Sequence, residues 1–546
     1  MNESNEKQEP KQRYRQLYVR LPIFIGVSFT LGILLGATMF GSNSGMKEIF
    51  LNYNKYREVL THIDQKYVDT VNIDELVDFS ISKMLEKLDP HTTYIPTEEV
   101  SLANTHLEGN YEGIGIEFNI YKDTIYVVAP IPNGPSETAG LRAGDKIISI
   151  NDEDVATIKI DNAGVFKRLR GEKGSKVQLG IVRQHSNEVL TYTVTRDEIP
   201  SISVYSYMLN EKTGFIKITR FARNTYEEFI VALKDMKQRG AKQLMIDLRD
   251  NPGGYMDDAV KIADELIAGD AMIVYTDGKG NLFDSEERAD KRGLFEKGPI
   301  VVLINEGSAS ASEILSGALQ DNDRALIVGR RSYGKGLVQM PIQLSDGSEL
   351  RLTISRYYTP SGRSIQKGYK SNEDYATDLL KRFEHGEMFH ADSIQFNDSL
   401  AYKTEKGRTV YGGGGIMPDY FVPLDTNANT TYANKLHEKN IPREFAIDYY
   451  NTHKKSLDAM ELSEFISTFK VDEAMIAQII QLGEANDIAY DKEAFKRSEQ
   501  MLKGHVKAYM AKTIWGNEGF YKIWYQDDKV YRQASRMFEE AEQLLK

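Results

Sequence analysis

Ile300-Val-Val-Leu-Ile304 followed by Gly307-Ser-Ala-Ser-Ala-Ser-Glu313 is the stretch that decides the fold. The apolar run predicts a buried strand, and the small residues after it predict a tight turn into a helix. A serine in such a turn lies beside free backbone N–H groups and the positive end of a helix dipole, which favour a developing oxyanion. Serine is also a common N-cap, so this motif alone leaves a catalytic role open.

The segment around this motif alternates between strand and helix patterns. Alternation of this kind predicts an α/β layer. The expected strands are residues 215–218, 243–248, 300–304 and 326–328, and the expected helices are residues 226–239, 256–267 and 309–319.

A second motif is Ser332-Tyr-Gly-Lys335-Gly-Leu-Val-Gln339. A lysine is a poor base at neutral pH unless burial lowers its pKa, and a neutral amine can then take a serine proton. No acid lies between Asp323 and Asp346 to keep Lys335 charged, and Gln339 is placed to hold the amine. The alternatives are a surface lysine and a phosphate-binding P-loop. The P-loop fails because its eighth position, a serine or threonine, is Gly336 here.

A third motif, Asp247-Leu-Arg-Asp-Asn-Pro-Gly-Gly254, follows a predicted buried strand. Its two glycines can turn backbone N–H groups toward a ligand, although a plain helix start has the same pattern. None of the nine histidines falls within residues 198–370, so a Ser-His-Asp triad would need a histidine from another domain. No metal site and no cofactor are predicted, because the H-E-x-x-H zinc spacing is absent.

Residues 104–197 contain short β-rich runs separated by glycine turns, which predict a small β-barrel or sandwich. Within it, Gly113-Ile114-Gly115-Ile116 precedes an open strand. A peptide can add there as an extra strand, with its terminal carboxylate held by glycine N–H groups. An ordinary β-turn is the alternative.

The bulk composition excludes several classes of protein. The net charge is −12 without a long basic stretch, which argues against a nucleic-acid groove. There are no cysteines, which excludes disulfides and a catalytic thiol and is compatible with a bacterial protein outside the cytoplasm. Hydrophobic residues make up 41% of the chain and charged residues 27%, as in globular proteins.

Residues 21–40 form an uncharged run of 20 residues, long enough at about 1.5 Å per residue to cross a bilayer. Lys11, Arg13, Arg15 and Arg20 precede it, which places the N-terminus in the cytoplasm. The alternatives are a cleaved signal peptide and a buried helix. The run is long for a signal peptide, and Ala37-Thr38-Met39 is a poor cleavage site. We therefore predict an uncleaved anchor.

Taken together, these motifs resemble those of the C-terminal processing peptidases, or tail-specific proteases. Residues 136–151 look like the PDZ signature, and residues 112–118 look like its carboxylate-binding loop. Leu88-Asp-Pro-His-Thr-Thr-Tyr94 is similar to the motif that ends the family's N-terminal helical arm. The resemblance covers residues 45–425. It implies a Ser–Lys dyad with Ser310 as nucleophile, Lys335 as base and Gln339 as its support. It also implies an oxyanion hole from Gly253 or Gly254 with Ala311, and a gating arginine at Arg170.

The expected fold is a multidomain α/β protease with an inserted PDZ domain. The expected parts are a cytoplasmic tail (1–20), a transmembrane anchor (21–40), a helical arm (43–103), the PDZ domain (104–197), the protease core (198–425) and a C-terminal helical extension (426–546). The expected protein is an inner-membrane endopeptidase with its catalytic part outside the cytoplasm. Its expected partners are proteins with apolar C-termini and, through the arms, a second copy. The rival interpretation is a non-catalytic PDZ scaffold. The helical extension is not explained by any family motif.

Overall fold

The computed structural model describes residues 22, 25–31, 44–121, 123–183, 188–290, 292–394, 397–426 and 428–546. The chain divides into two compact units, Met1–Met84 and Leu85–Lys546. In the first unit, a hydrogen bond between the Tyr56 and Ser80 hydroxyls joins α2 (Ser44–Lys66) to α3 (Ile73–Leu85). Of the predicted anchor only residue 22 and residues 25–31 are described, as helix, and the remainder lies outside the described residues. No helix in the described ranges is long and apolar enough to cross a membrane.

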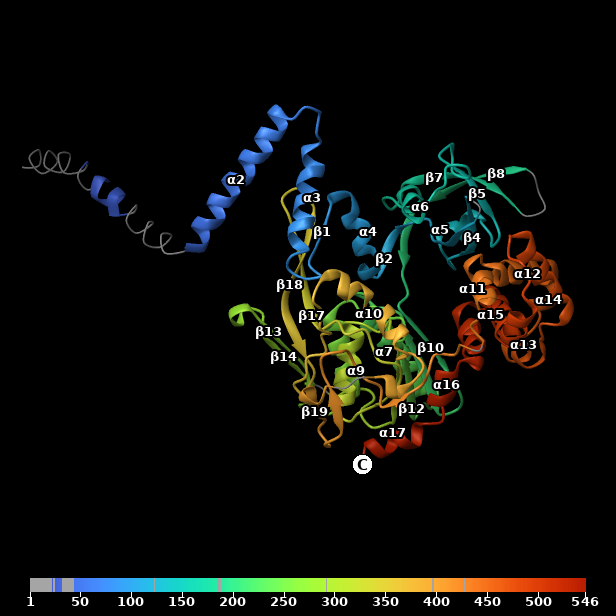
Figure 1. Ribbon diagram of the computed structural model, residues 1–546. Helices are drawn as coiled ribbons and strands as arrows, with labels where there is room; N and C mark the ends of the chain where they lie inside the picture. Colours follow the sequence, from blue (N-terminus) through green and yellow to red (C-terminus); the bar gives the residue numbers. More distant parts are fainter. Residues whose placement is uncertain are drawn as a thin grey trace, which may run out of the picture. The chain divides into compact units, whose positions relative to one another are not determined.

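A six-stranded sheet forms the centre of the second unit (Figure 1). Its first two strands are antiparallel and the others are parallel. Every residue of its central strand β15 is buried, as expected for a parallel strand covered on both faces. In spatial order the strands are β10 (Val204–Met208), β11 (Thr213–Ile218), β12 (Gln243–Asp247), β15 (Ile300–Ile304), β16 (Leu326–Gly329) and β21 (Tyr420–Phe421).

Different parts of the chain cover the two faces of this sheet. One face packs against α7 (Thr225–Gln238), α8 (Met256–Leu266) and α9 (Ala311–Asp321). The other face packs against α16 (Lys529–Ala534) and α17 (Phe538–Leu544), through Val530, Phe538 and Ala541. The C-terminal extension is therefore in part a structural layer that covers this sheet.

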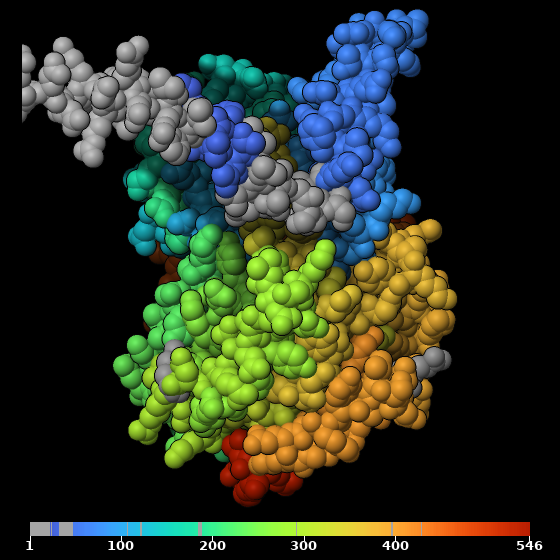
Figure 2. Space-filling model, turned by 90° about the vertical axis from the view of Figure 1, so that its left-hand side faces the viewer, coloured from blue at the N-terminus to red at the C-terminus, as the bar shows by residue number. Residues whose placement is uncertain are grey.

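A second, antiparallel sheet lies in the same unit. Its strands are β1 (Thr93–Ile95), β18 (Glu349–Tyr358), β13 (Met272–Gly278) and β14 (Ser285–Arg288), with β17 (Leu337–Gln343) also paired to β18. β17 pairs on one side only, which accommodates Pro341. The chain continues through α10 (Asn372–Glu384) and the hairpin β19 (Ala401–Lys403) and β20 (Thr409–Tyr411). In Figure 2, the green segments and the yellow-to-orange segments form one continuous surface.

The PDZ domain is inserted through two paired strands, β2 (Asn110–Gly113) and β9 (Asp197–Pro200). The helix before it, α4 (Thr97–Glu108), spans the predicted boundary between residues 103 and 104. Ile125, Ile147 and Leu179 are fully buried in the domain's own core. The domain consists of β3 (Ile116–Tyr121), β4 (Thr124–Pro130), α5 (Pro135–Ala139), β5 (Lys146–Ile150), β6 (Glu153–Asp154), α6 (Asn162–Leu169), β7 (Lys176–Val182) and β8 (Val189–Thr195).

The C-terminal region begins with a helical domain that has a core of its own. It consists of α11 (Thr431–Glu438), α12 (Ile441–Leu457), α13 (Leu462–Thr468), α14 (Glu473–Ala485) and α15 (Lys492–Trp524), which is kinked at Gly516. Arg443 and Lys512 both bind the Glu117 carboxylate on β3, at 2.5 and 3.0 Å, and so join this domain to the PDZ domain. The single-turn helices η1 (Lys279–Asn281), η2 (Ala391–Ser393), η3 (Asp398–Leu400) and η4 (Tyr525–Asp527) lie in the connections.

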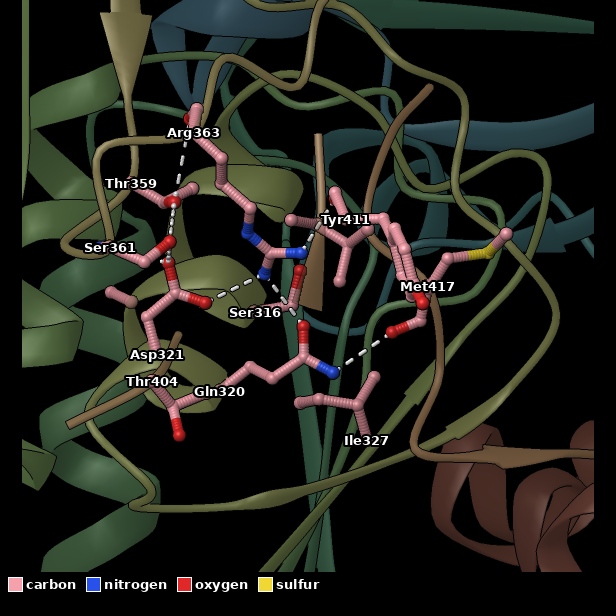
Figure 3. A network of polar contacts seen from close by, with 12 residues as sticks. Ser316, Gln320, Asp321, Ile327, Thr359, Ser361, Arg363, Thr404, Tyr411 and Met417 are labelled. Atoms are coloured by element: carbon pink, nitrogen blue, oxygen red, sulfur yellow. Dashed lines mark hydrogen bonds and ion pairs between the residues drawn. The ribbon is translucent and has the colours of Figure 1, made fainter. Parts of the chain in front are cut away.

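A buried polar network fixes the C-terminal end of α9 (Figure 3). Arg363 has no exposed side-chain surface, and its Nη2 donates to Asp321 and Gln320, both at 2.7 Å. Its Nη1 donates to the Tyr411 carbonyl at 2.9 Å. A buried ion pair needs further hydrogen bonds to offset its loss of hydration, and the oxygens of Gln320 and Tyr411 supply them here, while the Arg363 Nε has no partner among the described residues. The network holds α9 between two distant segments, while the other end of α9 carries Ser310.

Candidate active site

Ser310 lies in a strained turn immediately before α9. Its backbone has φ 55° and ψ −115°, a region that non-glycine residues rarely adopt. A strand–turn–helix geometry of this kind exposes the nucleophile in α/β-hydrolases. Gly253 lies directly against this turn, because a Cβ atom there would come within 2.7 Å of the Ser310 Cβ. The partly exposed Ser310 hydroxyl therefore depends on a glycine at position 253.

Hydrogen bonds join the nucleophile turn to the turn after β12. The Ala309 N–H and the Ser312 hydroxyl both donate to the Asn251 carbonyl at 3.0 Å. The Asn305 side chain accepts from the Asp250 N–H and donates to the Asp250 carboxylate, both at 2.8 Å. The two motifs predicted separately from the sequence thus form one connected structure.

The predicted oxyanion donors Gly253, Gly254 and Ala311 meet in this structure. The Gly253 N–H donates to the Asn251 side-chain oxygen at 2.9 Å and is already used. Across the described ranges, neither the Gly254 N–H nor the Ala311 N–H donates to an acceptor of the chain. Gly254 and Ala311 are therefore the two predicted donors that remain available to an oxyanion.

The predicted base Lys335 is held by the predicted support Gln339. Its Nζ donates to the Gln339 Oε1 at 2.7 Å, and the Gln339 Nε2 donates to the His91 carbonyl. Burial lowers the pKa of Lys335, and the nearby Arg351 lowers this pKa further. A lower pKa makes more of the amine neutral at physiological pH, as a general base requires.

Glu313 is a site residue for which the sequence analysis gave no role. Its fully buried carboxylate accepts hydrogen bonds from the Ser310 N–H and the Lys335 N–H, both at 2.9 Å. The same carboxylate accepts from the Gly334 N–H at 2.7 Å. Glu313 therefore joins the backbones of the predicted nucleophile and base. The signal in the sequence was the Ser-x-x-Glu spacing, in which the glutamate reaches back to the N–H of the N-cap residue.

Two further residues complete these connections. The Tyr357 hydroxyl lies within hydrogen-bonding distance of the Ser310 and Lys335 carbonyls. The His91 carbonyl is presented by a turn in which Asp89 accepts from the N–H groups of His91 and Thr92, at 2.7 and 2.8 Å. The residue 88–94 motif thus positions Gln339, the predicted support of Lys335.

The chain was compared with known proteins. The model of peptidase family S41 matches residues 212–375, and a PDZ model matches residues 126–183. A carboxyl-terminal-processing protease of Picosynechococcus is 36% identical over 53% of this chain and 70% of that protein. A carboxy-terminal-processing protease of Bartonella bacilliformis is 32% identical over 62% of this chain and 80% of that protein. The chain belongs to the C-terminal processing peptidases, serine proteases of peptidase family S41.

Two further matches are a family that covers part of the C-terminal region and a solved structure. A family of unknown function matches residues 432–516, which form most of the C-terminal helical domain. The photosystem II D1 C-terminal processing protease is a solved structure with 28% identity, a TM-score of 0.33 and coverage of 57% of this chain and 89% of that one.

The predicted peptide-binding loop lies at an open edge of the PDZ sheet. β3 is the edge strand of that sheet and pairs with β4 alone. Ile114 and Ile116 are buried in the domain core, and Gly115 has a φ of 70° that favours glycine. Phe118 on β3 faces Phe166 on α6, with ring centroids 5.6 Å apart. Within the part of the chain that the structure describes, the edge of β3 opposite β4 pairs with no other strand.

Arg170, the predicted gating residue, lies at the end of α6. Its guanidinium stacks on Phe166 at 4.3 Å and Tyr111 at 5.1 Å, and its Nη1 donates to the Thr105 hydroxyl at 2.5 Å. The residue therefore connects the PDZ helix to α4. Its role in gating stays a prediction.

The activity of the peptidase is expected to fall about tenfold between pH 8 and pH 6, because burial raises the pKa of Glu313 to about 7. Protonation of the Glu313 carboxylate weakens the hydrogen bonds that it accepts from the N–H groups of Ser310 and Lys335. The lowered pKa of Lys335 contributes to the same acid limb, because only the neutral amine is a base. A profile of kcat against pH measures the effect.

The stability of the fold is expected to fall as the pH rises, whereas the activity rises with pH. The folded-state pKa of Glu313, about 7, lies above the ordinary value of 4.5 for a glutamate, so the folded chain binds more protons than the unfolded chain between these two values. The free energy of unfolding therefore decreases as the pH rises from about 4.5 to about 7. In Glu313→Gln this contribution is absent, and a profile identical to that of the wild type would contradict the assignment.

Proposed function

We propose that the chain is a membrane-anchored endopeptidase that selects proteins by their apolar C-terminal tails and cleaves them with a Ser310–Lys335 dyad. The observation that supports the proposal is that hydrogen bonds hold both Ser310 and Lys335, and that Glu313 binds to both of them. Lys335 has a lowered pKa and is held by Gln339, while Glu313 binds the backbone N–H of both dyad members. A serine is a weak nucleophile until an adjacent base accepts its proton.

Hydrolysis then proceeds in two halves. The neutral Lys335 amine accepts the Ser310 proton as Oγ attacks the scissile carbonyl carbon, and the Gly254 and Ala311 N–H groups stabilise the oxyanion. The C–N bond breaks as Lys335 returns the proton to the leaving amine, which leaves an acyl ester on Ser310. Water attacks this ester while Lys335 takes its proton. Collapse of the second tetrahedral intermediate releases the carboxylate product, and the proton returns to Ser310.

Recognition of the tail is proposed to occur at the β3 edge. A peptide strand would pair with the β3 backbone, and glycine-rich N–H groups at residues 113–116 would hold its carboxylate. The aromatic rings of Phe118 and Phe166 favour an apolar side chain.

The test uses one protein substrate with three tails: apolar with a free carboxylate, apolar with an amidated end, and acidic. We expect kcat/KM to fall at least about tenfold for the second and third substrates, because each loses one element of recognition. Equal cleavage of all three would refute tail recognition. Binding of the apolar tail without any cleavage would instead favour the PDZ scaffold.

Membrane attachment is proposed from the sequence of residues 21–40 and the basic residues before them. The catalytic part would then lie outside the cytoplasm of a bacterium, at the inner membrane. The full chain should resist alkaline extraction from membranes, and external protease should digest its C-terminal part in spheroplasts. Release by alkali would refute the anchor.

The helical arm is proposed to pair with a second copy of the chain. On α2 the side chains of Ile49, Phe50 and Leu51 are 69%, 64% and 59% exposed. Exposed apolar clusters of this kind are typical of protein interfaces. Light scattering of the full chain in detergent should give a dimer or larger assembly, and Phe50→Glu should reduce it to a monomer. A monomeric wild type would refute the proposal.

A further inference from the structure

The turn that carries the oxyanion donors begins at a buried cluster of charges. Asp247 ends β12 and accepts two hydrogen bonds from the Arg249 guanidinium, at 3.1 and 2.8 Å. The Lys217 amine lies 3.4 Å from the Asp247 carboxylate and donates to the Arg249 carbonyl at 2.6 Å. These three side chains contribute two positive charges and one negative charge at the end of the strand.

A carboxylate from the C-terminal region supplies a second negative charge, which balances the cluster. Asp528, 279 residues further along the chain, accepts from the Arg249 Nη1 at 2.6 Å. Its side chain is 20% exposed and that of Arg249 is 10% exposed. Tyr525 lies beneath the same guanidinium, 5.2 Å from ring centre to carbon. Asp528 therefore completes a neutral cluster of two cations and two anions, and its loss would leave a buried cation uncompensated.

The cluster is directly connected to the catalytic turn. Arg249 is followed by Asp250 and Asn251, whose contacts fix the nucleophile turn, and then by Gly253 and Gly254. The segment is also held by the Asn251 Nδ2, which donates to the Ile218 carbonyl at 3.0 Å, and by the Gly253 carbonyl, which accepts from the Phe221 N–H at 2.8 Å. A displacement of Arg249 would act on the Gly254 N–H through this connected turn. Oxyanion donors act through preorganisation, so a small displacement reduces the rate of the chemical step rather than substrate binding.

We propose that Asp528 is a positioning residue of the active site, which fixes Arg249 and thereby the turn that presents the Gly254 N–H. The inference rests on the proposed function for its catalytic consequence. The C-terminal segment thus supplies a charge on which the geometry of the oxyanion hole depends.

Asp528→Asn tests the proposal with little other disturbance. Asp528 also caps α16 by accepting from the Tyr531 N–H at 2.8 Å, and asparagine retains this cap. In the full chain, kcat is expected to fall about tenfold with KM changed less than about twofold. Asp528→Glu, which keeps the charge, should recover most of the lost kcat. The matched control is Asp527→Asn at the exposed neighbouring residue, which should match the wild type.

Hydrogen exchange gives a second measurement that needs no catalysis. In the Ser310→Ala background, the hydrogen-bonded amides of Arg249, Asp250, Asn251 and Gly253 should exchange faster when Asp528 is asparagine. Unchanged exchange at this turn, or an unchanged kcat, would overturn the proposal. Cleavage retained by Ser310→Ala alone would instead refute the proposed function, so the two failures are distinguishable.

Discussion

Ser310→Ala is expected to abolish cleavage of a tail-bearing protein while leaving the fold intact. Loss of a serine nucleophile reduces kcat by about 10⁴-fold or more, because the hydroxyl and its base act as one unit. The fold should persist, since the Ser310 N–H still donates to Glu313 and the side chain is only partly buried. Alanine also has the same difficulty as serine at φ 55°, so no new strain arises.

The neighbouring serine provides the matched control. Ser312 donates to the Asn251 carbonyl at 3.0 Å, and Ser312→Ala removes this support without removing the nucleophile. It should keep measurable cleavage at a reduced rate. The measurements are the turnover of a tail-bearing protein and the melting temperature of each variant. Substantial cleavage by Ser310→Ala would show that another residue is the nucleophile.

Replacement of Lys335 is expected to be as damaging as replacement of Ser310. Lys335→Ala removes the base, and Lys335→Arg replaces it with a guanidinium that stays charged at any working pH and cannot accept a proton. Both variants should lose about 10⁴-fold in kcat. Activity in Lys335→Arg would mean that the residue contributes a positive charge and not a base.

The absence of cysteine allows a chemical rescue of this residue. In Lys335→Cys the only thiol of the chain can be alkylated with 2-bromoethylamine, which rebuilds an amine of nearly the length of lysine. The thiol form should be inactive, and the alkylated form should regain part of the wild-type kcat. An alkylated variant that stays inactive, with the alkylation verified by mass spectrometry, would contradict the role as base.

The sequence predicted the local elements well because their patterns are local. Residues 300–304 are a continuous apolar run and residues 244–246 a shorter one, and the structure has β15 and β12 there. The helix α10 was missed because its few apolar residues give no clear stripe, and of its aromatic residues only Tyr375 is buried. The two motifs that contain Ser310 and Lys335 lie in one site, but the residue that joins them, Glu313, was not assigned a role.

Local sequence patterns did not predict the contacts between distant segments. Nothing near Arg249 indicates that Asp528 is its partner, since the pair is separated by 279 residues. Similarly, α16 and α17 lie in the predicted helical extension, and their packing on the protease sheet has no signal other than their apolar side chains. Such contacts depend on the tertiary arrangement, because the apolar face of a sheet must be buried against another apolar element, which can come from anywhere in the chain.

The covering of the sheet by α16 and α17 has a consequence for the biosynthesis of the enzyme. Ile300–Ile304 and Leu326–Gly329 are translated long before Phe538–Leu544, so one face of the sheet stays bare while the intervening domain is made. Domains generally fold as units during synthesis, and a unit that awaits a late segment folds late. The nascent chain should therefore gain proteolytic activity only after α17 has emerged from the ribosome.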